Sequence, residues 1–228
     1  MREGNFMPLL LPSRDSIQLS IDAGTEEDYH LVRLYYSWYA GWFYRHRLKM
    51  VSNLMVGESF DKLLEIGTGS GILILELLKH ANLVVGMDIH SSYHGVRKML
   101  EREGADISRV ELRQGDIFDV PYPDHSFDAV VCVSVLEHFP DPRPALEEIR
   151  RVVRPQGPII MGFPAETAMT KFIFASLGYD AHEIHPASHL TILATINEVL
   201  AMDKVSIFPL TRIPMYIACR AYATKLIQ

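Results

Sequence analysis

The chain has 228 residues, of which 48% are hydrophobic and 22% are charged, as is usual for a globular protein. This length is enough to bury a core without help from metals or disulfides, so we expect a single α/β domain. The formal net charge of −6 provides no general basic field, which disfavours broad nucleic-acid binding.

Cysteine usage and hydropathy predict the compartment. Cys132 and Cys219 both fall within apolar, strand-like runs, where a free thiol behaves as a small hydrophobic residue. This usage indicates a reduced, cytoplasmic setting. No apolar run approaches the ~20 residues that a transmembrane helix needs, and the N-terminus has too short an apolar core for a signal peptide. We therefore expect a cytoplasmic protein without a transmembrane segment.

The N-terminal quarter is predicted to be an arm followed by a helical segment. Residues 1–24 have two prolines and a loose apolar pattern, which is typical of an arm lying on a surface. Residues 26–55 are predicted to be helical, dense in aromatic residues and interrupted by Gly41. This segment is interpreted as packing against the main domain, as a cover over an active site, or as a peripheral membrane contact. The last interpretation rests on the basic residues among the aromatics, Arg33, Arg45, Arg47 and Lys49.

From residue 62 onwards, predicted strands and helices alternate, which favours a mostly parallel sheet with helices on both faces. Near the C-terminus, a short connection joins two apolar runs and permits only an antiparallel hairpin. The predicted strands are 62–66, 83–88, 109–114, 127–134, 159–163, 205–210 and 214–221, and the predicted helices are 71–80, 91–103, 144–153 and 189–202.

The segment LLEIGTGSGIL at residues 63–73 predicts a strand that ends in a tight glycine turn before a helix. Glycine accepts positive φ and has no Cβ, so Gly67, Gly69 and Gly71 allow a ligand to lie directly against the main chain. Thr68 belongs to the same turn. The alternative is an ordinary glycine-containing turn without a ligand.

Polar residues follow three further predicted strands, and parallel strands bring such ends together at one edge of a sheet. Asp88 is placed to accept hydrogen bonds from ribose hydroxyls, or else to cap the helix that follows. Asp116 would lie beside an adenine edge, with Ile89 and Ile117 as apolar faces for the ring. Ser134 and His138 follow the fourth strand.

Four motifs together resemble the class I S-adenosylmethionine-dependent methyltransferases. They are ExGxGxG at Glu65–Gly71, a strand ending in Asp88, QGDIFDVPYPDHSFDAVVCVSVLEHF at 114–139, and ALEEIRRVVRPQG at 145–157. The resemblance covers about residues 60–163 and is strongest to the small-molecule branch that includes ubiquinone and menaquinone C-methyltransferases. It implies a Rossmann-like, seven-stranded, mostly parallel sheet with a C-terminal antiparallel hairpin.

The same resemblance implies the donor and its site. S-adenosylmethionine would be the methyl donor and S-adenosylhomocysteine the product. Residues 60–163 would form the donor-binding core, 1–55 an arm and helical cover, and 164–228 the acceptor-side helix and terminal strands. The implied donor-binding residues are Glu65 beside the amino-acid portion, the turn Gly67, Thr68, Gly69 and Gly71, Asp88 on the ribose, Ile89, Asp116 and Ile117 at the adenine, and Ser134 through its main chain.

Two other functions are weighed. A nicotinamide-dependent oxidoreductase shares the glycine turn and the acid, but Ile72 replaces the third glycine of GxGxxG, and Tyr93 is followed four residues later by Arg97 instead of lysine. A non-catalytic relative that keeps the fold as a binding module is the second alternative. Measured binding of the donor would separate it from an enzyme.

Methyl transfer mainly requires alignment of the acceptor and exclusion of water. A general base is needed only for a protonated acceptor, and His138 is the candidate, although a positioning role fits it equally. His182, His185 and His189 are interpreted as a loop near the acceptor entrance or a solvated loop, because their spacing lacks a zinc pattern. We expect no metal. The acceptor is expected to be a small molecule, and neither its identity nor the oligomeric state has a signature in the sequence.

Overall fold

The computed structural model describes residues 8–21, 32–90, 93–167 and 186–224. Its centre is a seven-stranded sheet in the order β3-β2-β1-β4-β5-β7-β6. The first five strands are parallel, whereas β7 runs antiparallel to both β5 and β6. The predicted fold class is confirmed. The strands are β1 (Phe60–Ile66), β2 (Ala81–Asp88), β3 (Val110–Gln114), β4 (Ala129–Val133), β5 (Pro158–Pro164), β6 (Ala201–Leu210) and β7 (Ile213–Tyr222).

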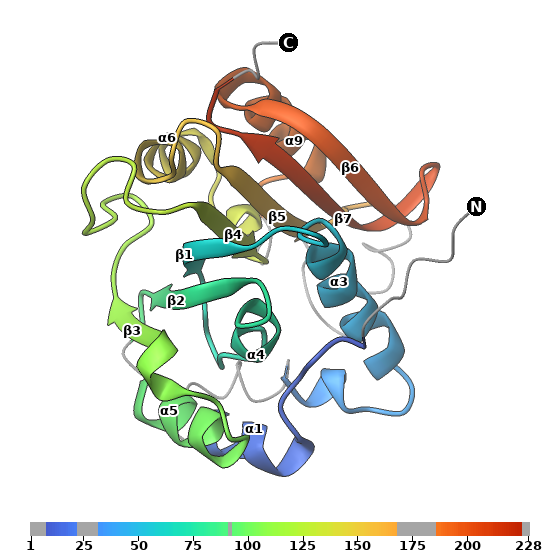
Figure 1. Ribbon diagram of the computed structural model, residues 1–228. Coiled ribbons are helices and arrows are strands. Elements are labelled where there is room, and N and C mark those ends of the chain that lie inside the picture. The colour runs from blue at the N-terminus through green and yellow to red at the C-terminus, as the bar shows by residue number, and fades with distance from the viewer. Residues whose placement is uncertain (1–7, 22–31, 91–92, 168–185, 225–228) are drawn as a thin grey trace.

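Helices cover both faces of this sheet (Figure 1). One face packs against α6 (Arg143–Val152) and α9 (His189–Val199), and their buried residues join one hydrophobic cluster. The other face packs against α1 (Arg14–Ile21), α3 (Gly41–Asn53), α4 (Ile74–Leu77) and α5 (Tyr93–Arg102). Two short 3₁₀ helices, Ile107–Arg109 and Leu136–His138, lie between these elements. Because both faces are buried, the central strands are nearly continuous apolar runs.

The strand order reverses beside β1, which pairs with β2 on one side and with β4 on the other. All three strands are parallel, so their carboxyl ends meet at one edge of the sheet. In open α/β sheets, ligands bind outside this edge at the point of reversal. The fold therefore brings together the chain segments that follow Ile66, Asp88 and Val133.

The helical segment predicted over residues 26–55 is interrupted, but the break comes before Gly41 and not at it; residues 22–31 lie outside the described residues. The chain leaves helical conformation over residues 36–40, and α3 begins only at Gly41. Here the Ser37 hydroxyl donates to the carbonyl of Leu34 and accepts from the N–H of Ala40. A serine side chain that bonds the nearby backbone in this way competes with helical hydrogen bonding.

Boundaries in the last third also differ from the prediction. The helix predicted to run to Met202 ends at Val199, and β6 begins at Ala201 instead of Val205. Residues at the start of β6 pair with the end of β7, where Arg220 contacts Asp203 at 2.6 Å. This pairing with a distant strand overrides the helical pattern of the sequence. Similarly, the helix predicted at residues 71–80 is only the single turn α4, flanked by turns.

The N-terminal arm is attached to the helices that follow β1 and β2. The Leu10 N–H donates to Glu76 Oε2 at 2.7 Å, and the Ser13 hydroxyl donates to Glu103 Oε1 at 2.6 Å. Next to these contacts, α1 lies so close to α5 that a Cβ on Gly95 would be 2.4 Å from the Leu19 carbonyl oxygen. The predicted arm therefore contains a helix, α1, that the loose apolar pattern did not indicate.

Two predictions from composition can be compared with the described residues. Cys132 on β4 and Cys219 on β7 are both free and buried. In the same described ranges, none of the helices has the length and apolar character required to cross a bilayer.

Candidate active site

The glycine turn after β1 has the backbone that its sequence predicts. Gly67, Gly69 and Gly71 all have positive φ, at 78°, 48° and 72°. A Cβ on Gly67 would lie 2.2 Å from Val135 Cγ2, so this position is closed by packing. A Cβ on Gly69, by contrast, would have no atom within 4 Å. A Cβ on Gly71 would lie 2.5 Å from Val96 Cγ1, so the turn is open only at Gly69, where the main chain has no side chain in front of it.

Glu65 lies at the end of β1, directly before the turn, and is only 4% exposed. Its Oε2 is buried and has no hydrogen-bond partner among the described residues. Burial raises the pKa of Glu65 to about 8, although a hydrogen bond from Thr68 opposes this shift. A buried acceptor without a donor is costly, and such atoms are uncommon in native structures. Glu65 is therefore arranged to receive a donor, preferably a cationic one.

Thr68 differs from its neighbours in the turn because its side chain faces the protein. It is buried, and its hydroxyl packs against β2, where a Cβ on Gly86 would lie 2.8 Å from the Thr68 Oγ1. This packing holds the turn on the sheet. A direct side-chain contact between Thr68 and a ligand is not supported by this orientation, so its predicted binding role rests on its main chain.

Asp88 at the end of β2 is tied to the glycine turn. Its Oδ2 accepts from the Gly69 N–H at 2.7 Å, and its Oδ1 accepts from the His90 N–H at 3.0 Å. Asp88 remains partly exposed, and carboxylate oxygens have further lone pairs for two more donors. The neighbouring Ile89 side chain is exposed. This strand end therefore offers both predicted features, carboxylate lone pairs on Asp88 that can accept further hydrogen bonds and the exposed apolar side chain of Ile89.

The segment after β3 forms a turn that presents Asp116 to solvent. Asp116 Oδ1 accepts from the Phe118 N–H at 2.9 Å. Ile117 is buried in the core, so it offers less surface to an adenine ring than the sequence suggests. Phe118 instead is exposed and packs edge-on against Phe139, with ring centroids 4.7 Å apart. This aromatic pair was not predicted as part of the site.

Ser134 after β4 has a strained backbone and an unpredicted partner. Its φ is 56°, which is uncommon for a residue other than glycine, and its N–H donates to the Gly162 carbonyl at 2.7 Å. Its hydroxyl accepts from Arg47 Nη2 at 2.5 Å. The Arg47 side chain, which comes from α3, thus reaches the carboxyl end of β4. Backbone strain of this kind is frequent at functional sites.

Arg47 is held in place by aromatic rings. Its guanidinium carbon lies 4.4 Å from the Tyr216 ring centroid and 5.1 Å from the Tyr44 ring centroid. The Nε atom is buried without a hydrogen-bond partner in the described ranges, as is the Tyr216 hydroxyl. The Tyr216 ring has room because the neighbouring residue on β5 is Gly162. A Cβ at that position would lie 2.4 Å from the Tyr216 hydroxyl oxygen. This arrangement fixes a positive charge beside Ser134.

Glu137 and His138 occupy the 3₁₀ helix after β4, in different surroundings. Glu137 is buried, its Oε2 has no hydrogen-bond partner in the part of the chain that the structure describes, and burial raises its pKa to about 7 against the opposing charge of Arg47. His138 is exposed. A buried carboxylic acid that titrates near neutral pH is suited to accept a proton. Glu137 is therefore a second candidate base beside His138.

Only the end of the predicted histidine loop lies within the described residues. His182 and His185 lie outside the described residues. His189 begins α9, and its Nδ1 is buried without a partner in the described structure. Burial lowers the pKa of His189. Among residues 8–21, 32–90, 93–167 and 186–224, no group of three or more His, Cys, Asp or Glu could hold a metal ion.

Residues 64–161 match the protein family described as "Methyltransferase domain". This range runs from β1 to β5 and includes the glycine turn and the three polar strand ends. Over these residues the chain has a domain of the class I S-adenosylmethionine-dependent methyltransferase type. The resemblance predicted from the motifs is confirmed.

Two relatives of this chain show where the similarity lies. The ubiquinone biosynthesis O-methyltransferase of Alkalilimnicola ehrlichii is 29% identical over 134 residues, which cover 58% of this chain and 53% of that protein. The demethylmenaquinone methyltransferase of Deinococcus radiodurans is 34% identical over 112 residues, covering 46% of this chain and 44% of that protein. The chain thus spans about half the length of these curated relatives.

A solved structure shows the same fold. The N-methyltransferase NodS from Bradyrhizobium japonicum WM9, in complex with S-adenosyl-L-homocysteine, superposes with a TM-score of 0.60 at 18% identity. The superposition covers 78% of this chain and 86% of NodS. At this level of identity, the likeness is one of architecture.

Proposed function

We propose that this protein transfers the methyl group of S-adenosylmethionine to a small-molecule or lipid-like acceptor. The observation that carries the proposal is the buried Oε2 of Glu65, which has no hydrogen-bond partner among the described residues and lies immediately before a glycine turn that is open at Gly69. A ligand with an ammonium group and a nucleoside would satisfy both features. The family match over residues 64–161 supports the same ligand.

In this proposal, the two ends of the donor are held by different charges. The amino-acid portion carries an ammonium group, for which Glu65 is the acceptor, and a carboxylate, for which the fixed guanidinium of Arg47 is the partner. The ribose hydroxyls donate to Asp88, and Ile89, Asp116 and the rim of Ile117 bound the adenine. Ser134 contributes its main chain. The structure of NodS with S-adenosyl-L-homocysteine supports a donor of this class.

When bound, S-adenosylmethionine supplies a methyl group on a positively charged sulfur, which leaves as a neutral thioether. The residues of this chain need to align the acceptor atom in line with that bond and to exclude water. If the acceptor arrives protonated, Glu137 or His138 takes the proton as the new bond forms. Glu137 is the better candidate because it is buried and its pKa is near 7.

The acceptor class is proposed from the relatives. One relative is named a demethylmenaquinone methyltransferase and another, from Cereibacter sphaeroides, a phosphatidylethanolamine N-methyltransferase. These names combine ring-containing and lipid acceptors, and both kinds carry long apolar groups. We propose an acceptor with an apolar portion, methylated in the cytoplasm, where the free cysteines on β4 and β7 would stay reduced.

Calorimetry tests the proposal. S-adenosylmethionine and S-adenosylhomocysteine are expected to bind with saturable heats, whereas NAD and NADP give none. Transfer of an isotope-labelled methyl group to a panel of quinol-like phenols and lipid amines then separates an enzyme from a binding module. Saturable binding of NAD without a response to either sulfur compound would contradict the proposal.

A further inference from the structure

Exposed aromatic and aliphatic side chains gather where α3 meets the β6–β7 hairpin. Trp38, Tyr39 and Trp42 are exposed before and at the start of α3, and Trp38 is 94% exposed. At the tip of the hairpin, Leu210 is 64% exposed and Ile213 is exposed as well. We call these five residues the aromatic–hairpin surface.

The two parts of this surface are continuous. The Trp42 ring packs edge-on against Phe208 of β6, with centroids 5.4 Å apart, and His46 of α3 lies 4.4 Å from the same ring. A protein in water rarely leaves two tryptophans and neighbouring aliphatic side chains exposed in one place, and such patches mark contact sites. Indole and phenol rings also favour the interface between water and a lipid bilayer.

The charge around this surface is opposite to that of the whole chain. The chain has a net charge of −6, yet residues 32–57 and 204–224 contain no Asp or Glu. The same two segments contain Arg33, Arg45, Arg47, Lys49, Lys204, Arg212 and Arg220. Arg220 is paired with Asp203 and Glu58, and Arg47 points into the candidate site. Arg45 and Arg212 are exposed beside the aromatic residues.

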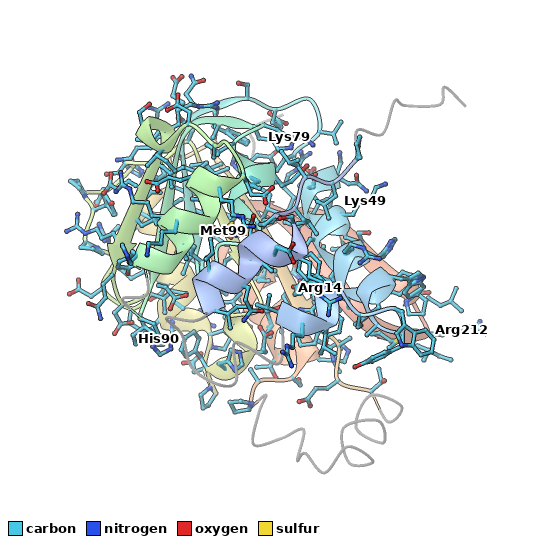
Figure 2. The ribbon with its side chains drawn as sticks, turned by 90° about the horizontal axis from the view of Figure 1, so that it is seen from below. Arg14, Lys49, Lys79, His90, Met99 and Arg212 are labelled. Atoms are coloured by element: carbon cyan, nitrogen blue, oxygen red, sulfur yellow. The ribbon has the colours of Figure 1, made fainter. Side chains whose placement is uncertain are left out.

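The arrangement in space agrees with this charge pattern. Figure 2 shows Lys49 of α3 and Arg212 of the hairpin on the same side of the molecule, away from His90. Exposed aromatics surrounded by basic residues complement a bilayer that contains anionic lipids, because each basic residue near such a surface strengthens binding roughly fivefold. An anionic bilayer repels the acidic residues elsewhere on the chain, which favours this side as the one that faces the lipid.

We propose that the aromatic–hairpin surface docks this protein on anionic lipid bilayers. The rings of Trp38, Tyr39 and Trp42 enter the headgroup region together with the hairpin tip, and the basic residues contact the lipid phosphates. Docking does not depend on the proposed methyl transfer. Because α3 carries both Trp42 and, five residues later, Arg47, the lipid-bound surface and the candidate site would share one helix.

Sedimentation with vesicles tests this proposal on the full chain. One set of vesicles is phosphatidylcholine alone, and the other contains roughly a third phosphatidylglycerol. Trp38→Ser combined with Leu210→Ser removes apolar contact, and Arg212→Glu reverses one charge. Matched controls are Leu190→Ser on α9, where Leu190 is 66% exposed, and Arg97→Glu on the exposed side of α5. Circular dichroism verifies that each variant is folded.

The expected result is binding to the anionic vesicles that weakens with salt. The double variant and Arg212→Glu each lower the partition coefficient about tenfold or more, whereas Leu190→Ser and Arg97→Glu leave it unchanged. Equal losses in the controls would overturn the proposal, as would an absence of vesicle binding by the parent protein. A parent that does not bind vesicles, but forms a dimer that Trp38→Ser dissociates, would assign the surface to contact between copies.

Discussion

Two regions of this protein each contain a buried glutamate close to the glycine turn, and the two residues behave in opposite ways. Glu76 on α4 is 1% exposed and accepts from the Leu10 N–H, the Ser52 hydroxyl and the Lys79 ammonium. Glu65 is 4% exposed, and its Oε2 has no donor within the described residues. Burial is therefore nearly the same, but only one carboxylate is satisfied.

The pKa values express this difference. Burial alone would raise the pKa of Glu76, but nearby His80 and the hydrogen bonds from Ser52, Leu10 and Lys79 lower it to about 2. The pKa of Glu65 is raised to about 8 by burial. The comparison teaches that a buried carboxylate whose oxygens all accept from the chain holds elements together. One with an unpaired oxygen, like Glu65 Oε2, can receive a donor that the chain does not supply.

The largest expected effect is on the free energy of unfolding. Glu76→Gln should lower it by about 3 kcal/mol, because the buried donors lose a charged partner. For a chain of this size, that corresponds to a fall in Tm of roughly 6–12 °C. Glu65→Gln is the matched control and should leave Tm unchanged or raise it. Thermal unfolding followed by circular dichroism measures both, and equal losses in the two variants would remove the distinction.

Acid unfolding sharpens the same comparison. The folded pKa of Glu76 lies below its ordinary value of 4.5, so its contribution is fully present above pH 4.5 and is lost as the pH falls towards about 2. The protein should therefore lose stability over this range. In Glu76→Gln the loss between these pH values should be smaller, which denaturant titrations at several pH values would detect.

Arg47→Met should weaken binding of S-adenosylhomocysteine about 10- to 100-fold, because the ligand carboxylate loses a charged hydrogen-bond donor. Binding of 5′-methylthioadenosine, which lacks the amino-acid portion, should not change. Calorimetry with both ligands separates this local effect from damage to the fold. A similar loss for both ligands would mean that Arg47 supports the site only through its packing on Tyr216 and Tyr44.

Asp88→Ala should weaken binding about tenfold, because the ribose hydroxyls lose their acceptor. Asp88 is intermediate between the two glutamates, since its oxygens already accept from Gly69 and His90 while the side chain remains partly exposed. The ribose is common to both ligands, so the loss should be equal for S-adenosylhomocysteine and 5′-methylthioadenosine. If affinity is unchanged in a folded Asp88→Ala protein, Asp88 is only a structural tie for the turn.

The smallest expected effect is the dependence of donor affinity on pH. In the free protein, Glu65 is protonated below about pH 8, and the ammonium group of the ligand favours its ionised form. Binding should therefore release a proton, and affinity should rise by less than about tenfold between pH 7 and pH 8. The measurement uses Glu137→Gln so that the second buried carboxylate does not titrate. Adding Glu65→Gln should flatten the profile.

The sequence was sufficient for the sheet, its hairpin and the glycine turn, because these depend on local patterns of apolar residues and glycines. It could not distinguish Glu65 from Glu76. The donors that lower the pKa of Glu76 include the main chain of Leu10, 66 residues earlier, and this contact has no local pattern. The same holds for the break before α3, where one serine side chain replaces helical hydrogen bonds.

Arg47 escaped prediction for a related reason. In the sequence it is one of several basic residues in an aromatic helix, and nothing local separates it from Arg45, which is exposed. Its position depends on Ser134 and on Tyr216, which come from β4 and β7. The predicted roles of His138, Asp116 and the other donor-site residues stay predictions until a ligand is bound.

The attachment of the N-terminal arm also has a consequence for biosynthesis. Ser13 leaves the ribosome before its partner Glu103, which follows 90 residues later. At about 5–20 residues per second, the wait lasts roughly 5–20 s. Over that time α1 has no α5 to pack on, and its buried face, Ile17 and Ile21, is available to chaperones or to neighbouring nascent chains. A slower codon stretch between these two positions would lengthen this exposure without changing a single residue of the finished protein.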